Sequence, residues 1–199
     1  MSIIAILQHG AHNFNFNGLT IEVKEVEEIP LKIENYNTYY HGYWISDKFF
    51  NSIIDIIKTE FTFPKIKDKQ NKKYAALIEK SINPIAIHIR RGDMAQLGWC
   101  CNPEHFQNSI FFSENIWHPD QYFLFSDDLK WCTTHADELG LNNIKKRLFI
   151  VDANSGENAY RDMQLMSMCR HRISDHSTFS LMAFLLCPYA NKHDINNWK

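Results

Sequence analysis

The chain has 199 residues, of which 45% are hydrophobic and 22% are charged, and its formal net charge is −2 with a pI near 6.5. This composition is typical of an ordinary globular protein and argues against disorder. Because the chain lacks a strongly basic character, we do not expect nucleic-acid binding, and any anionic ligand must be held by a local group of residues.

The first part of the chain carries few strong periodic patterns. HNFNFNG is turn-like, and IEVKEV alternates as a short strand does. Apolar residues at helical spacing then predict one helix from Ser46 to Pro64 and another through Tyr74 up to about Ser81. We therefore expect residues 1–80 to form a shortened N-terminal segment with a helical linker.

From residue 81 onward, strand-like and helix-like segments alternate. The strand-like runs IAIHI, YFLF and RLFIV are followed by the helical patterns EHFQNSIFF, DDLKWCTTHADEL and ENAYRDMQLMSMC, the second ending at Gly140. A short RIS and the apolar STFSLMAFLL follow. This alternation predicts an α/β fold for residues 81–199, with a Rossmann-like parallel sheet whose ligands bind beyond the carboxyl ends of the strands.

Polar residues follow three of the predicted strands. Because the carboxyl ends of parallel strands lie along one edge of a sheet, we expect these residues to share one rim. They are His88, Arg90, Arg91 and Asp93 after the first strand, Ser126, Asp127 and Asp128 after the second, and Asp152, Asn154, Ser155 and Gly156 after the third.

The adjacent arginines at the end of IAIHI suggest an anionic ligand. Successive side chains of an extended chain point to opposite faces, so at most one of Arg90 and Arg91 is expected to face a ligand while the other pairs with a carboxylate such as Asp93. A simple surface ion pair is the alternative. The chain has only seven glycines, with neither G-x-G-x-x-G nor a P-loop, so a bound diphosphate would need guanidinium groups and helix N-termini.

No metal site is expected. The consecutive carboxylates of SDD are better suited to capping a helix than to binding a cation. DANSGENAYRDM departs from a calcium loop, because Gly156 falls one place early and the twelfth position is Met163. The ten histidines include neither an H-x-H nor an H-x-x-x-H pair, so zinc is not indicated either.

Asp162 lies near the start of the helical pattern ENAYRDMQLMSMC. A carboxylate there could accept two parallel N–H bonds from the edge of a guanine base. It could equally serve as a negative charge that complements the helix N-terminus.

The cysteines and the apolar segments indicate a cytoplasmic protein. The five cysteines are odd in number and contain no C-x-x-C pair, which is typical of reduced thiols. MSIIAILQHG lacks a basic segment before its short apolar run, and SLMAFLLC is far shorter than the roughly 20 residues of a spanning helix.

Taken together, these blocks resemble the inverting α-1,2-fucosyltransferases, which transfer fucose from GDP-fucose to a galactoside. The matching blocks occur in the order expected for that family. They are HGYWISDKFF (41–50), EFTF (60–63), HIRRGD (88–93), YFLFSDDLKWC (122–132), YRDMQLMSMCRH (160–171) and HSTFS (176–180).

The resemblance implies a role for each matched residue. The family's H-x-R-R-x-D motif, shared with the α-1,6- and protein O-fucosyltransferases, implies that Arg90 holds the β-phosphate and stabilises the charge on departing GDP. His88 and Arg91 would assist it, and Asp93 and Asp127 would give structural support. The guanine-reading aspartate of the family falls on Asp162.

The family's S-S-F-S segment contacts the nucleotide phosphates, and it falls on Ser177, Thr178, Phe179 and Ser180. Members have the two-domain GT-B fold and need no metal. The glycine-rich segment that begins family members has no match in residues 1–40. The chain is therefore expected to be the nucleotide-binding half of a GT-B enzyme with a truncated N-terminal part, residues 81–199 forming the nucleotide-sugar-binding domain.

The resemblance implies metal-independent, inverting transfer of L-fucose from GDP-fucose to the 2-hydroxyl of a galactoside or glycan acceptor, without any cofactor. One alternative is a noncatalytic or partner-dependent GDP-sugar-binding remnant. Another is a transferase that uses a different GDP-sugar. Members commonly build bacterial surface glycans, which suggests peripheral contact with the inner face of a membrane.

Overall fold

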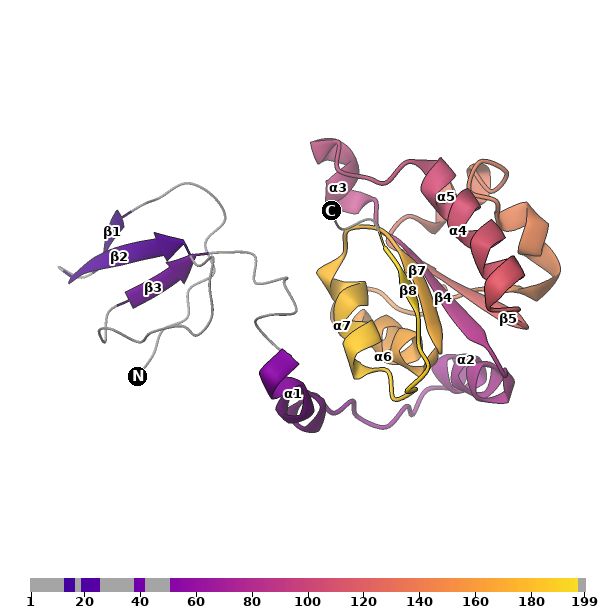
Figure 1. Cartoon of the computed structure of the whole chain (residues 1–199), viewed down its shortest axis with the longest axis horizontal. Helices are drawn as coiled ribbons and strands as arrows, with labels where there is room; N and C mark the ends of the chain where they lie inside the picture. Colours follow the sequence, from indigo (N-terminus) through magenta and orange to yellow (C-terminus); the bar gives the residue numbers. More distant parts are fainter. Residues whose placement is uncertain (1–12, 17–18, 26–37, 42–50, 197–199) are drawn as a thin grey trace. The chain divides into compact units, whose positions relative to one another are not determined.

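The computed structural model describes residues 13–16, 19–25, 38–41 and 51–196. The chain divides into two compact units, Met1–Ile57 and Lys58–Lys199 (Figure 1). No helix in the described part of the chain is both long and apolar enough to cross a membrane.

The first unit contains a three-stranded sheet. Strand β1 (Asn13–Phe16) pairs antiparallel with β2 (Leu19–Glu25), and β2 pairs parallel with β3 (Thr38–His41). The strand predicted at IEVKEV is therefore confirmed. Within HNFNFNG, predicted to be turn-like, residues 13–16 form β1 instead, because the alternating N-F-N-F run has the period of two that a strand requires and pairs with β2. The other three residues of this stretch lie outside the described residues.

The end of this unit contains a 3₁₀ turn, η2 (Asn51–Ile53), which leads into helix α1 (Ile54–Glu60) across the boundary between the units. The helix predicted from Ser46 to Pro64 thus exists over its central part, and its predicted start lies outside the described residues.

The second unit is built on a five-stranded sheet in which every strand is parallel to its neighbours. Its order is β6-β5-β4-β7-β8, which confirms the predicted α/β, Rossmann-like parallel sheet. The strands are β4 (Pro84–Ile89), β5 (Gln121–Ser126), β6 (Leu148–Ile150), β7 (His171–Ser174) and β8 (Asp194–Ile195).

Helices cover both faces of this sheet (Figure 1). α2 (Lys69–Lys80), α6 (Tyr160–Met168) and α7 (Thr178–Leu186) lie on one face. α4 (Pro103–Ile116) and α5 (Leu129–Thr134) lie on the other. The shorter α3 (Gly92–Leu97), η3 (Leu141–Arg147) and η4 (Gly156–Asn158) connect these elements.

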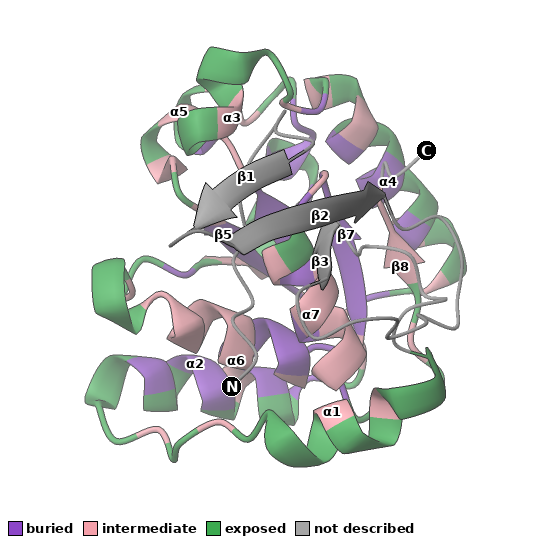
Figure 2. Cartoon of the chain, turned by 90° about the vertical axis from the view of Figure 1, so that its left-hand side faces the viewer, coloured by how far each residue is buried: buried purple, intermediate pink, exposed green. Residues whose placement is uncertain are grey.

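The alternation of side chains along β4 divides the core into two clusters. Ile85 and Ile87 pack toward Phe106 of α4, whereas Ala86 packs toward Ile78 of α2. All six residues of the strand are buried, which is typical of the central strand of a parallel sheet. The neighbouring strand β7 is buried as well (Figure 2). This alternation also places His88 on the face covered by α2, α6 and α7.

One further prediction differs from the structure, and the domain boundary expected between residues 80 and 81 stays a prediction. The helix predicted to end at Gly140 stops at Thr134, and Gly140 has a positive φ of 74° at the start of η3. The second compact unit begins at Lys58, and it includes α2, which the sequence assigned to the linker before residue 81. The reason is that Tyr74 and Ile78 of α2 are buried against the sheet.

Candidate functional site

Two carboxylates from neighbouring strands hold the chain where β4 ends. The Arg90 amide donates to Oδ2 of Asp175, beyond β7, at 2.6 Å. The Arg91 amide donates to Oδ1 of Asp127, beyond β5, at 2.7 Å. A Cβ added to Gly92 would lie 2.7 Å from Oδ2 of Asp127, so only glycine fits beside that carboxylate without displacing it. The backbone of the two arginines is therefore fixed from both sides.

The Arg90 guanidinium pairs with Asp93. Its Nη2 lies 2.9 and 3.0 Å from the two carboxylate oxygens. The Asp93 side chain is 62% exposed, and an ion pair this exposed contributes about 1 kcal/mol or less. The Nε of Arg90 is buried and has no hydrogen-bond partner among the described residues. Among the described residues, Arg90 thus has an unused donor and a single, exposed ionic partner, Asp93.

Arg91 has a different partner. Its guanidinium carbon lies 3.6 Å from the centre of the Trp131 ring, a cation–π contact, and its Nε lies 3.9 Å from Oδ2 of Asp128. Asp128 also caps α5 by accepting a hydrogen bond from the Trp131 amide at 3.0 Å. The expected carboxylate partner, Asp93, therefore pairs with Arg90, and Arg91 is held against α5.

His88 is a buried, neutral side chain. Burial, together with the positive charges of Arg172 and Arg90, lowers its pKa to about 3. Its ring centre lies 5.9 Å from that of Phe179 on α7, and its Nδ1 lies 3.8 Å from Oδ1 of Asp175. His88 therefore adds no positive charge at neutral pH, and its ring packs near Phe179.

Asp175 is a residue of this site that the sequence analysis did not select. It is 3% exposed, and burial raises its pKa to about 7, against the opposing effect of the Arg90 amide. Asp175 follows the short strand β7, so applying the strand-end rule to the RIS segment would have found it. It connects the end of β4 to the segment that begins α7.

Ser177 caps helix α7. Its Oγ accepts a hydrogen bond from the Ser180 amide at 3.4 Å, and its own amide donates to the Asp175 carbonyl at 2.9 Å. Thr178 is exposed, and Phe179 is half-buried beside His88. The structure thus brings the start of α7, whose first amides have no intrahelical acceptor, close to the end of β4 through Asp175.

Asp162 lies on α6 and forms a polar group with Asn154, which follows β6. Its Oδ1 accepts a hydrogen bond from Nδ2 of Asn154 at 2.6 Å. Burial raises the pKa of Asp162 to about 6, and the Asn154 hydrogen bond opposes this shift. The end of β6, which carries Asn154, turns toward α2: the Tyr74 hydroxyl donates to Oδ1 of Asp152 at 2.9 Å.

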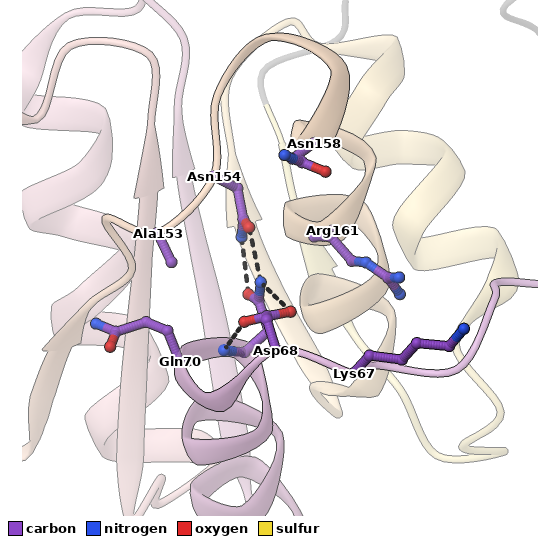
Figure 3. Close-up of a pocket in the computed structure, with 8 residues that line it drawn as sticks. Lys67, Asp68, Gln70, Ala153, Asn154, Asn158 and Arg161 are labelled. Atoms are coloured by element: carbon purple, nitrogen blue, oxygen red, sulfur yellow. Dashed lines mark hydrogen bonds between the residues drawn. The ribbon is translucent and has the colours of Figure 1, made fainter.

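The ends of β4 and β5 meet as expected, since the Arg91 amide donates to Asp127, and the segment after β6 contacts α2. A pocket of about 370 Å³ lies beside this contact (Figure 3). Neither Arg90 nor Ser177 lines it. Its lining residues are Lys67, Asp68, Gln70, Asn71, Ala153, Asn154, Asn158 and Arg161.

Among the residues that the structure describes, no group of three or more histidine, cysteine, aspartate or glutamate side chains is placed to hold a metal ion. The expectation that catalysis needs no metal stays a prediction.

Two curated proteins of Escherichia coli are similar to this chain. The α-1,2-colitosyltransferase is 26% identical over 145 residues, which are 70% of this chain and 48% of that protein. The O-antigen biosynthesis glycosyltransferase WbnK is 27% identical over 131 residues, which are 60% of this chain and 39% of that protein. The chain thus spans about half the length of the first relative and less of the second.

Among solved structures, a crystal structure of the α-1,6-fucosyltransferase NodZ soaked with GDP-fucose aligns with a TM-score of 0.44 and 19% sequence identity, over 76% of this chain and 52% of NodZ. The model of the family described as glycosyl transferase family 11 matches residues 13–191. Because this match spans most of its length, the chain belongs to glycosyl transferase family 11.

Proposed function

We propose that this chain provides the donor-binding part of an enzyme that transfers L-fucose from GDP-fucose to the 2-hydroxyl of a galactoside, with inversion and without a metal. Membership of a glycosyltransferase family supports transfer chemistry. The observation that carries the proposal is the placement of Arg90, whose amide is fixed by Asp175 and whose Nε lacks a partner in the described part of the chain.

The chemistry requires stabilisation of a leaving diphosphate. The acceptor hydroxyl attacks the anomeric carbon of the sugar and passes its proton to a general base as the bond to GDP breaks, and the bonding electrons leave with the diphosphate through an oxocarbenium-like state. Stabilising that negative charge is the largest electrostatic contribution to such a step. A guanidinium remains protonated at working pH, so Arg90 would supply this charge without a cation.

The other proposed site residues would contact either the phosphates or the guanine base of GDP-fucose. Ser177, Thr178 and Phe179 begin α7, whose N-terminal amides and positive dipole end favour an anion. Asp162 would read the guanine edge with its two carboxylate oxygens. Arg91, held against Trp131, would add positive charge beside Arg90.

The proposal is tested by measuring GDP binding to an Arg90→Ala variant by calorimetry. A charge-assisted hydrogen bond contributes about 1.5–3 kcal/mol, so we expect GDP to bind roughly 10- to 100-fold more weakly. Arg147→Ala is the matched control, because Arg147 precedes β6 at the amino end of the sheet and pairs with Glu114 at 2.6 Å. Equal affinity of the parent and Arg90→Ala would refute the phosphate role.

Two alternatives remain distinct from this proposal. A different GDP-sugar donor is suggested by the colitosyl activity in the name of one relative, and competition between GDP-mannose and GDP-fucose measures donor choice. A noncatalytic or partner-dependent GDP-sugar-binding protein is the second alternative. Turnover of GDP-fucose onto a β-galactoside by the purified chain would exclude that alternative.

A further inference from the structure

A chain of polar side chains connects Asp162 to the start of α2. Nδ2 of Asn154 donates to Oδ1 of Asp162 at 2.6 Å and to Oδ1 of Asn71 at 2.9 Å. Nδ2 of Asn71 donates back to Oδ1 of Asn154 at 2.8 Å and to Oδ2 of Asp68 at 3.1 Å. Asp68 also holds the backbone of Asn71, because the Asn71 backbone N–H donates to Oδ1 of Asp68 at 2.7 Å.

This reciprocal pair fixes the orientation of the Asn154 amide. If the amide were flipped, its oxygen would face the acceptor oxygens of both Asn71 and Asp162, and two hydrogen bonds would be replaced by repulsion. Asn71 is 4% exposed, so solvent does not compensate for the lost bonds. Both hydrogens of the Asn154 amide are therefore committed, one to α2 and one to the Asp162 carboxylate.

The same geometry determines what the Asp162 carboxylate can offer a ligand. Asn154 occupies one acceptor position on Oδ1, which leaves Oδ2 and the second lone pair of Oδ1 available. Two parallel acceptors suit a pair of neighbouring N–H donors, such as N1–H and the exocyclic amine of guanine. A carboxylate free to rotate would hold only one of these donors well.

We propose that Asn154 is a specificity-determining positioning residue, which orients the Asp162 carboxylate through the amide pair with Asn71 and thereby selects guanine over bases that lack the exocyclic amine. This inference rests on the guanine-reading role of Asp162 in the proposed function. Asn154 acts through Asp162 and is not itself assigned a contact with the nucleotide.

The test compares the dissociation constants of GDP and IDP, which differ by the exocyclic amine alone. In the parent we expect IDP to bind about 10-fold more weakly than GDP, as for the loss of one hydrogen bond to a charged group. In Asn154→Ala the ratio should fall to about 2-fold or less. A general weakening of the fold would change both constants together and leave the ratio unchanged.

Asn158→Ala is the matched control, because Asn158 lines the same pocket (Figure 3) and its side chain is exposed. The Asn158→Ala variant should keep the parental ratio of the IDP and GDP dissociation constants. Asn154→Asp is a second variant of nearly the same size, which can still accept from Asn71 but no longer donates to Asp162. It should also lose the discrimination, and thermal unfolding monitored by circular dichroism checks that each variant folds.

A carbon-13 NMR titration of the Asp162 carboxyl group tests the contact without any nucleotide. Removal of a donor to the charged form raises a carboxyl pKa, so Asn154→Ala should titrate above the parental value of about 6. The charged side chains that line the pocket beside Asn154 are Lys67, Asp68 and Arg161, and all three are unchanged in the variant.

The outcomes separate this inference from the proposed function. Loss of discrimination in Asn154→Ala, with discrimination kept in Asn158→Ala, supports the inference. A parental ratio retained in Asn154→Ala overturns the inference alone. If the parent itself does not distinguish GDP from IDP, the guanine role of Asp162 fails, and the inference fails with it.

Discussion

At the scale of single residues, the site is organised by carboxylates that hold backbone amides. Asp175 and Asp127 each accept a hydrogen bond from one of the two adjacent arginine amides, at 2.6 and 2.7 Å. Residue patterns alone indicated Arg90 and Arg91 because two cations beside an apolar strand are conspicuous. Asp175 was missed because β7 is only four residues long and its pattern is weak.

The buried Asp175 carboxylate should make stability depend on pH. Its pKa is raised from 3.8 to about 7 in the folded chain, so between these values the unfolded chain loses its proton first. Stability therefore falls as the pH rises from about 4 to about 7. Asp175→Asn keeps an acceptor for the Arg90 amide, removes this titration, and should flatten the dependence by up to about 4 kcal/mol.

Urea unfolding of the parent and of Asp175→Asn at pH 4.5 and pH 7.5 measures this effect. Glu157→Gln, at an exposed position in η4, is the control and should follow the parent at both pH values. A parallel pH dependence in the parent and Asp175→Asn would show that this carboxyl group does not titrate as described.

At the scale of elements, the strands of the sheet were the most predictable features. β4 and β5 are continuous apolar runs that the interior of a parallel sheet requires, and both formed where the sequence placed them. α5 was overestimated, because DDLKWCTTHADEL has helical spacing but the helix stops at Thr134 and the chain continues through turns to Gly140. The spacing of apolar residues along the chain gives no information about the tertiary contacts that end a helix.

Local sequence patterns also do not predict the contacts of the segment that follows β6. Asn154 and Asp152 were expected at the rim with Arg90 because they follow a strand. Their contacts with Asn71 and Tyr74 join segments more than 70 residues apart, and no local pattern encodes them.

The start of α7 depends on its cap. Ser177 Oγ accepts from the Ser180 amide, and replacing such a cap by alanine typically costs about 1 kcal/mol. We expect Ser177→Ala to lower the free energy of unfolding by about this amount in urea titrations. Thr178→Ala, at the exposed first position of the helix, should change it by less than about 0.5 kcal/mol.

If the α7 start also holds phosphate, Ser177→Ala should weaken GDP binding as well as stability, whereas a cap with no ligand role would affect stability alone. Unchanged unfolding of Ser177→Ala would contradict the capping role.

At the scale of the whole molecule, the boundary between the two units can be tested with fragments. Both clusters of buried apolar residues lie within Lys58–Lys199, and one includes Tyr74, Ala75 and Ile78 of α2. A fragment of residues 58–199 should therefore unfold cooperatively on heating. A fragment of residues 81–199 lacks α2 and should expose the sheet, since each large apolar side chain lost from a core costs about 2–5 kcal/mol.

Differential scanning calorimetry of the two fragments distinguishes the boundaries. A cooperative transition of similar midpoint in both fragments would show that α2 is dispensable and would favour the boundary at residue 80.

The pairing of Arg90 with Asp93 has a consequence for how the molecule selects anions. With a net charge of −2, the chain creates no long-range attraction for phosphates, and the guanidinium already holds a carboxylate at 2.9 Å. If Arg90 holds a phosphate as proposed, ligand entry exchanges one oxyanion for another, and breaking the Asp93 pair offsets part of the free energy of the new contact. Small ions such as sulfate therefore bind weakly by this exchange alone. Tight binding requires a molecule whose other atoms make further contacts with the protein.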